Sequence, residues 1–551
     1  MNRHLIILLS FFSLFHCKKS TQFEYRKIKI SESIPRIDNV ESDSNWLYKD
    51  IIDDSIPGLS FFKAKNTILK NKKAEEVIVA VIDSKFDINH EALKGFIWEN
   101  PNETLNYKDD DGNGFVDDIY GWNFIGNAES ENVIYANYEY VRLIRYYEGR
   151  FNDISIDDIN TTDTTAFNIF LKAKNKLSSE LVVAKKRLEY SNKLRKKYFD
   201  AKKALHSYFP DFKYTYDVLN KIDTTRYKGL APHVKEIAEV IKWKETDEMI
   251  VSVNSFYKNK LNKLLNIDFN ERTLVGDNPY DLNDSIYGNN NIHSLVKRFD
   301  HGTRVSSIIA DLFKNDNKQV KLLPISTSPT GNYHDKDLAL AIRYAVNNGS
   351  KVINMSFEKH FSIHNEWVLD AIKYAEKKNV LIVKASGNSN LNLVHDNDGY
   401  PRDYIDNGEE IVDNFLLVSA SSYQANENLK VGFSNYGKKI VDVFAPGQDL
   451  QTAIPYNKYR SDGGTSLSAA VTSGLAALIF SYYPNLTASQ VKHIIMDSGV
   501  EYTFPVKTPT KEDKNKMTPF NELSKSGKIV NAYNALIMAD SVSKSNKRKR
   551  D

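Results

Sequence analysis

The sequence predicts an α/β protein in which helices cover both faces of a central parallel sheet and one long α-helical hairpin is inserted. Continuous apolar runs, typical of strands buried on both faces, recur at residues 77–82, 351–355, 380–383, 415–419 and 440–444. Amphipathic helical stretches at 336–347 and 366–377 lie between these runs. Alternating strands and helices imply a parallel sheet that is covered on both sides.

The segment 130–274 breaks this alternation, because it is rich in Lys, poor in Gly and long in helical period. Its apolar side chains recur at steps of three and four in two runs, one at Phe170, Ala173, Leu177, Leu181, Ala184 and Leu188, the other at Ile237, Ile241, Ile250, Val253, Tyr257, Leu261 and Leu264. Pro210, Gly229 and Pro232 separate the runs. An antiparallel helical hairpin is the simplest interpretation. Its charges form solvated helix faces or, alternatively, a binding surface.

The N-terminus has the pattern of a secretory signal over residues 1–17. Arg3 and His4 precede an apolar run at 5–15, which is too short to span a hydrocarbon core of about 30 Å. Cys17 is the only cysteine, so a disulfide within the chain is excluded. A cysteine at this position resembles the lipobox of bacterial lipoproteins, in which the thiol is lipidated, although His16 stands where that motif prefers a small residue. The alternative is an ordinary cleaved signal with an incidental cysteine.

The length and composition of the chain limit how its remaining segments can be organised. A chain of 551 residues exceeds what one compact core usually holds. We expect a tether and lead-in at 18–73, a main domain at 74–540 that the insertion interrupts, and a basic tail at 541–551. The net charge of +3, against 74 basic and 71 acidic side chains, gives no general field that would favour nucleic acid as a partner.

Three residues carry the pattern of nucleophilic catalysis. Asp83 ends the first apolar run, His301 opens a helical stretch in DHGTRVSSIIA, and Ser466 follows a Gly-rich turn in GGTSLSAAVTSGLAAL. A serine nucleophile needs a base to take its proton and a carboxylate to orient that base. Each residue alone also has an ordinary structural role, as a strand end, a surface histidine or a helix N-cap. Their order along the chain, Asp, His and Ser, is that of subtilisin.

The blocks VIDSKFDINH, HGTRV, INMSF, KASGNSN and GTSLSAA resemble the signature motifs of subtilisin-like serine peptidases, over residues 77–538 apart from the insertion. The stretches VGDNPYDLNDSIYGNNN and KDLALAIRYAVNNGSKVINMSF further resemble subtilases of the Bacteroidetes type, which are often lipoproteins. The resemblance implies a subtilisin-like fold and an exported endopeptidase that acts on polypeptides and needs no cofactor for its chemistry. We expect a periplasmic or outer-membrane lipoprotein held by a lipid anchor, or otherwise a secreted protein.

The resemblance also assigns residues around the nucleophile. Asn388 corresponds to the side-chain donor to the oxyanion, assisted by the backbone N–H of Ser466. A loop asparagine that bonds its own turn is the alternative. Ser356 matches the strand whose backbone pairs with an extended substrate. The segment from Ala385 to Gly387 corresponds to one wall of the pocket for the residue before the scissile bond.

Four residues depart from the family pattern. Arg304 replaces the second histidine of HGTHV, and Ala470 and Val471 replace the proline and histidine that usually follow the nucleophile. Glu358 stands where a glycine normally lines the substrate cleft. If its carboxylate faces the pocket, we expect a preference for Lys or Arg there; if it blocks the pocket, we expect low activity. None of these changes removes a chemical group from the reaction.

The loop DDDGNGFVDD raises the question of a structural calcium ion. Asp109, Asp111 and Asn113 occupy alternate positions suited to oxygen ligands, with Gly114 at the sixth place. The twelfth place is Tyr120 instead of glutamate, which excludes an EF-hand. A solvated Asn-Gly turn among acidic residues is the alternative.

Two functions therefore compete. The first is a serine endopeptidase that forms an acyl-enzyme on Ser466. The second is a catalytically silent subtilase scaffold that binds a partner through the helical insertion. The presence of Asp83, His301, Ser466 and Asn388 favours the enzyme, because loss of any one would be the simplest mark of silencing.

Overall fold

A computed structural model describes residues 25–35, 45–70, 72–154, 159–160, 163–211, 213–314, 319–394, 399–405 and 409–548. The predicted signal at 1–17, with Cys17, lies outside the described residues, as do parts of the predicted lead-in and the last three residues.

The chain forms two compact units. Unit 1 consists of Met1–Val133, Arg272–Pro329 and Tyr333–Asp551, and unit 2 of Ile134–Glu271 and Thr330–Asn332. Each unit is described by itself.

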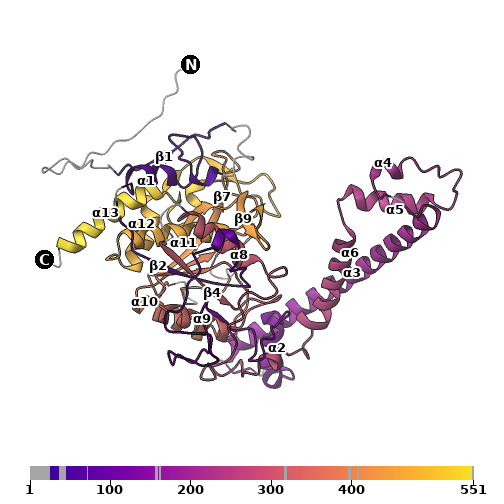
Figure 1. Ribbon diagram of the computed structural model, residues 1–551, viewed down its shortest axis with the longest axis horizontal. Helices are drawn as coiled ribbons and strands as arrows, with labels where there is room; N and C mark the ends of the chain where they lie inside the picture. Colours follow the sequence, from indigo (N-terminus) through magenta and orange to yellow (C-terminus); the bar gives the residue numbers. More distant parts are fainter. Residues whose placement is uncertain are drawn as a thin grey trace, which may run out of the picture. The chain divides into compact units, whose positions relative to one another are not determined.

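Unit 1 is built on a ten-stranded sheet of order β1-β11-β14-β8-β7-β6-β5-β2-β4-β3 (Figure 1). The strands are β1 Lys29–Ile30, β2 Val77–Asp83, β3 Trp122–Asn123, β4 Val320–Ser326, β5 Val352–Met355, β6 Leu381–Ala385, β7 Phe415–Ser421, β8 Val443–Pro446, β11 Val500–Tyr502 and β14 Lys528–Ile529. Neighbouring strands are parallel throughout, except for the antiparallel pair of β11 and β14. The predicted α/β class with a mainly parallel sheet is confirmed.

Two short antiparallel pairs lie outside this sheet. They are β9 Leu450–Ile454 with β10 Lys458–Asp462, and β12 Pro505–Lys507 with β13 Met517–Pro519.

The expected apolar runs correspond to β2, β5, β6 and β7, whereas β8 begins only at Val443. The strand β4 was not expected from the sequence, although it pairs with β2 along seven residues. Lys321 and Pro324 interrupt its apolar run, and a proline inside a segment argues against a central strand.

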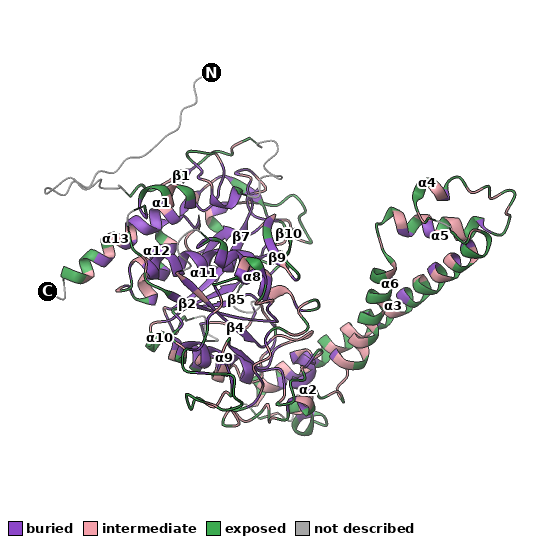
Figure 2. Ribbon diagram, in the orientation of Figure 1, coloured by how far each residue is buried: buried purple, intermediate pink, exposed green. Residues whose placement is uncertain are grey.

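Helices cover both faces of the sheet (Figure 1). On one face lie α8 His301–Asp311, α11 Thr465–Tyr482, α12 Ala488–Ser498 and α13 Ala532–Arg548, and on the other α9 Asp335–Asn347 and α10 Asn365–Lys377. Within the described part of the chain, α11 is long and apolar enough to cross a membrane, but 94% of it is buried inside the protein. It is the central core helix, packed against β2, β5, β6, β7 and β8 (Figure 2).

Part of the expected tether belongs to the folded core, which corrects the boundary at residue 73. The turn of 3-10 helix Trp46–Tyr48 and the helix α1 Phe61–Thr67 bury Trp46, Leu47 and Phe61 in the main apolar cluster. The sequence did not predict these elements, because their apolar residues are too irregularly spaced to show the period of a strand or a helix. The basic tail is likewise helical as far as Arg548, because α13 continues through it.

Unit 2 contains α2 Glu139–Phe151, α3 Thr164–Tyr208, α4 Tyr216–Leu219, α5 Ala231–Lys242 and α6 Asp247–Asn259, followed by a π-helical turn at Lys260–Leu264. The 45-residue helix α3 packs against α2, α5 and α6. A small apolar cluster joins α3 to the segments that return beside it, with buried members Tyr198, Ala201, Leu205, Leu219, Leu230, Ile237, Val240 and Ile250.

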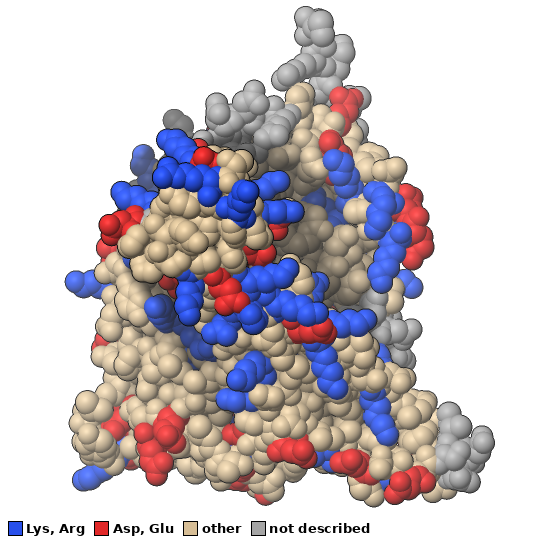
Figure 3. All heavy atoms as spheres, turned by 90° about the vertical axis from the view of Figure 1, so that its right-hand side faces the viewer, with Lys and Arg blue, Asp and Glu red and all other residues tan. Residues whose placement is uncertain are grey.

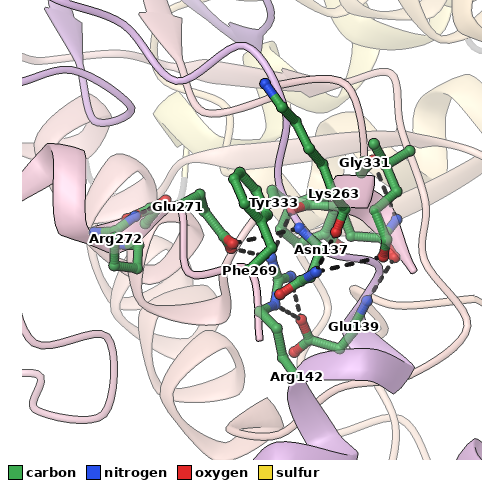
Figure 4. A network of polar contacts seen from close by, with 12 residues as sticks. Asn137, Glu139, Arg142, Lys263, Phe269, Glu271, Arg272, Gly331 and Tyr333 are labelled. Carbon is green, nitrogen blue, oxygen red and sulfur yellow. Dashed lines mark hydrogen bonds and ion pairs between the residues drawn. The ribbon is translucent and has the colours of Figure 1, made fainter. Parts of the chain in front are cut away.

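The two ends of unit 2 are joined by a buried polar network (Figure 4). Arg142 is 1% exposed, forms ion pairs with Glu139 and Glu271, and donates to the carbonyl oxygen of Asn332 at 3.0 Å. The backbone N–H of Glu139 donates to the side-chain oxygen of Asn332 at 3.0 Å. Because the Arg142 guanidinium is paired and bonded in several directions, its burial is compensated.

Lys and Arg side chains gather on the helices of unit 2 (Figure 3). Several belong to pairs one turn apart, such as Lys193 with Glu189 and Lys196 with Asp200. Solvent screens such exposed pairs, so they contribute little to stability. They are the contacts expected of a solvated helix face.

Candidate active site

The predicted functional residues meet at the carboxyl edge of the sheet. Asp83 is the last residue of β2, Ser356 directly follows β5, and Asn388 lies three residues after β6. These strands are neighbours in the order β6-β5-β2, so their carboxyl ends share one edge. His301 is the first residue of α8 and Ser466 the second of α11, and both helices pack on the same face of the sheet.

Asp83 holds the imidazole of His301 in one orientation. The carboxyl group is 2% exposed, and both of its oxygens lie 2.9 Å from Nδ1 of His301. The backbone N–H of Ser84 donates to Oδ1 of the same carboxylate at 2.7 Å. Since the carboxylate only accepts, Nδ1 carries the proton and Nε2 keeps the lone pair that a base requires.

Ser466 lies at the start of α11, where the helix N-terminus favours developing negative charge. Its hydroxyl donates to the carbonyl oxygen of Ser356 at 3.1 Å, and the Ser356 hydroxyl donates back to the carbonyl oxygen of Ser466 at 3.0 Å. This exchange ties the segment after β5 to α11.

Asn388, the predicted oxyanion donor, bonds to Thr465, the residue before Ser466. Its side chain is exposed, while Oδ1 accepts from the backbone N–H of Thr465 at 2.9 Å and from its hydroxyl at 3.1 Å. This arrangement turns the amide nitrogen away from Thr465. A Cβ on Gly464 would lie 3.8 Å from both Nδ2 of Asn388 and the backbone N of Ser466, so the two donors border the same space. Thr465 was not expected from the sequence to have a positioning role.

Glu358 lies against the segment that the sequence assigns to the pocket wall. Gly387 has a φ of +100°, and a Cβ there would come within 2.3 Å of Oε1 of Glu358. The other carboxylate oxygen would lie 3.0 Å from a Cβ on Gly399. The carboxylate therefore occupies space that the glycines leave open. Ala385, at the end of β6, is 3% exposed and therefore lies inside the protein beneath this segment.

Arg304 links the helix of His301 to the end of β10. It forms ion pairs with Asp300, at 3.2 Å, and with Asp462, four residues before Ser466. Burial by itself would raise the pKa of Asp462, but the hydrogen bond and charge of Arg304 hold that pKa below its usual value. Asp462 was not singled out from the sequence, because a partner 158 residues away leaves no local signal.

The two substitutions that follow Ser466 do not disturb the helix. Ala470 and Val471 are both fully buried, and α11 runs without interruption from Thr465 to Tyr482. Small and apolar side chains fill the positions that proline and histidine occupy in the family pattern.

The acidic loop gathers three carboxylates. Ligand oxygens of Glu103, Asp109 and Asp111 lie within 4.8 Å of one another. Oδ1 of Asn113, the third predicted ligand, accepts from the backbone N–H of Phe115 at 2.7 Å. Glu103, which the sequence did not single out, is 6% exposed and accepts from the backbone N–H of Asp111 at 3.0 Å. Carboxylate oxygens are the ligands that calcium prefers, so this set fits the ion.

Comparison with known proteins finds the same family that the sequence motifs resemble. The model of the subtilase family matches residues 74–524. The chain is similar to the cell wall-associated protease of Bacillus subtilis, with 30% identity over 262 residues, 45% of this chain and 27% of that protein. It is similar to subtilisin DY of Bacillus licheniformis, with 31% identity over 202 residues, 35% of this chain and 68% of that protein.

Among solved structures, that of the prenylagaramide maturation protease PagA is similar at 25% identity and a TM-score of 0.34, covering 43% of this chain and 82% of that chain. The match over residues 74–524 shows that the chain belongs to the subtilase family of serine-type peptidases.

Proposed function

We propose that the chain is an exported serine endopeptidase that cleaves polypeptides through Asp83, His301 and Ser466. One observation carries this proposal: Nδ1 of His301 lies 2.9 Å from both oxygens of the buried Asp83 carboxylate. A neutral imidazole held in this way presents Nε2 as a base. Ser466, at the start of α11, supplies the nucleophile.

In this proposal Ser466 attacks the scissile carbonyl carbon while Nε2 of His301 accepts the hydroxyl proton. The amide nitrogen of Asn388 and the backbone N–H of Ser466 stabilise the negative oxygen of the tetrahedral intermediate. His301 then donates its proton to the leaving amine, which leaves an acyl group on Ser466. Water resolves this acyl-enzyme by the reverse sequence, and Asp83 orients the imidazole throughout.

A fluorophosphonate probe tests the proposal, because it reacts covalently only with an activated serine. The native protein should be labelled and should cleave peptides, Ser466→Ala should do neither, and the control Ser461→Ala, altered at an exposed position of β10, should behave as native. Equal absence of labelling in native protein and Ser466→Ala would refute the endopeptidase. That result would favour a silent scaffold that binds a partner through unit 2.

For the substrate, we propose that Glu358 selects Lys or Arg before the scissile bond. Support comes from its carboxylate, which lies against Gly387 beside the oxyanion donor Asn388. A hydrogen bond to a charged group contributes about 1.5–3 kcal/mol, so Glu358→Gln should lower the ratio of Arg-peptide to Leu-peptide cleavage about 10–100-fold. Glu366→Gln, on α10, is the control and should leave the ratio unchanged. An unchanged ratio in Glu358→Gln would contradict the assignment.

We also propose that the protein is a periplasmic or outer-membrane lipoprotein anchored through Cys17. The leader sequence supports this location, because its apolar run at 5–15 is followed, after His16, by the single cysteine. Native protein should enter the detergent phase on phase separation, and Cys17→Ser should stay in the aqueous phase. His16→Ala keeps the thiol and should behave as native. Aqueous partitioning of the native protein would indicate a secreted form.

Finally, we propose that Glu103, Asp109 and Asp111 hold a structural calcium ion. Three clustered carboxylates repel one another, and a divalent cation removes this repulsion. The ion has no part in the proposed chemistry.

A further inference from the structure

Asn435 is a buried asparagine whose side chain and backbone N–H all bond to one loop. It is 1% exposed, and its Oδ1 accepts from the backbone N–H groups of Ser389, at 3.1 Å, and Leu391, at 2.9 Å. Its Nδ2 donates to the carbonyl oxygen of Ser386 at 2.8 Å, and its backbone N–H donates to that of Gly387 at 3.0 Å. These four bonds reach residues on both sides of Asn388, the proposed oxyanion donor.

The chemistry of this contact requires a primary amide. One end must accept from two N–H groups while the other donates to a carbonyl, which an asparagine side chain does in a single orientation. A serine at this position has one oxygen and a shorter reach. An ionised aspartate keeps the accepting oxygens but loses the donor.

The loop of residues 386–391 depends on such support because its backbone is unusual. Gly387 has a φ of +100° and Asn390 has a φ of +52°, positive values that few residue types other than Gly and Asn adopt readily. Asn388 itself is exposed, and its side-chain hydrogen bonds within the described structure run to Thr465. The direction of its amide therefore depends both on Thr465 and on how the backbone beneath Asn388 is held.

Asn435 is in turn fixed to the sheet. Its carbonyl oxygen accepts from the hydroxyls of Ser419, on β7, at 2.7 Å and of Ser434 at 2.9 Å. The Ser419 hydroxyl also lies 2.9 Å from that of Ser386, at the base of the loop. A Cβ on Gly387 would lie 2.5 Å from Nδ2 of Asn435, which shows how closely the amide packs beneath the loop.

We propose that Asn435 is a positioning residue for the reaction: it holds the loop 386–391 so that Asn388 presents its amide to the oxyanion. This inference rests on the proposed function of Asn388. It predicts that Asn435 affects the rate only through Asn388.

A double-mutant cycle with Asn435→Ser and Asn388→Ala tests this directly, using an uncharged chromogenic peptide. Asn388→Ala alone should lower kcat about 10²–10³-fold, as expected for loss of an oxyanion donor. Asn435→Ser should lower kcat about tenfold or more in the native background, with KM changed less than about twofold, because misplacement costs rate and not binding. In the Asn388→Ala background the same substitution should change kcat less than about twofold, because interacting sites are not additive.

A native kcat in Asn435→Ser, or an equal loss in both backgrounds, would overturn the inference, since a merely structural role does not depend on Asn388. Asn414→Ser is the matched control. Asn414 is fully buried at the sheet, and its Nδ2 donates to the carbonyl oxygen of Val380 at 2.8 Å, away from the loop. This control should lower the melting temperature and leave kcat unchanged.

Should Asn435→Ser fail to accumulate as folded protein, Asn435→Asp provides the same cycle, because it keeps the two accepted hydrogen bonds and loses the donated one. It should lower kcat in the native background only; an equal loss in both would overturn the inference. A native kcat in Asn388→Ala would refute the proposed oxyanion role itself. Loss in Asn388→Ala without any loss in the Asn435 variants would refute only the positioning role.

Discussion

Arg304→Gln should destabilise unit 1 in a way that depends on pH. The guanidinium pairs with Asp300, next to His301, and with Asp462, in the loop that leads to Ser466. Glutamine keeps part of the side-chain length and removes the charge. The substitution leaves the Asp462 carboxylate with Arg460 as its remaining cation, at 3.2 Å.

The magnitude follows from the burial of this pair. The side chains of Arg304 and Asp462 are only 17% and 20% exposed, so solvent screens them less than a surface pair. Loss of a hydrogen bond between charged groups at such a site costs about 1.5–3 kcal/mol of unfolding free energy. A control is Arg343→Gln, whose partner Asp370 is 67% exposed and whose loss should cost less than about 1 kcal/mol.

The pH dependence has a definite sign. Burial acts to raise the pKa of Asp462, but Arg304 outweighs it and holds the pKa below the usual value. A carboxyl group of this kind contributes stability above its unfolded pKa of about 3.9 and loses it as pH falls through the folded pKa. The difference between native protein and Arg304→Gln should therefore be constant above about pH 5 and shrink below about pH 4.

Urea unfolding at pH 7 and at pH 3.5, followed by circular dichroism, measures both effects. A cycle with Asp462→Asn should show that the two substitutions are not additive, with a coupling of about 1 kcal/mol or more. Additive losses, or a loss that is as large at pH 3.5 as at pH 7, would refute the reasoning.

Three further predictions concern other sites. Asp83→Asn should lower kcat about 10⁴-fold with little change in KM, because an amide favours the wrong tautomer of His301; a loss below tenfold in steady-state assays would contradict this role. Chelation with EDTA should lower the melting temperature of the native protein and not that of Glu103→Gln, and an unchanged native melting curve would count against calcium. Burial, together with the charge of Asp442, raises the pKa of Asp403 to about 7. Stability should therefore fall from about pH 4 to pH 7, and Asp403→Asn should stabilise the protein by up to about 4 kcal/mol at pH 8 and by almost nothing at pH 4, as measured by urea unfolding; equal effects at both would refute this.

The sequence by itself determined the features that depend on neighbours along the chain. Strands β2, β5, β6 and β7 are continuous apolar runs, and burial on both faces of a parallel sheet requires such runs. Asp83, His301 and Ser466 could be named because each lies at a strand end or helix start within a local motif. The strand β4 escaped prediction because Lys321 and Pro324 break its pattern.

Only the tertiary structure decided which distant groups meet. In the sequence, Arg304 is recognisable only as a cation in place of a histidine. Its ion pair with Asp462 forms because the fold brings α8 beside the end of β10. Glu103 belongs to the acidic cluster although it lies outside the motif at 109–118. Asn435 bonds to the loop of Asn388 although the two are 44 or more residues apart in the sequence. A side-chain hydrogen bond leaves no periodic trace in sequence, because its partner is set by how strands and helices pack and not by spacing along the chain.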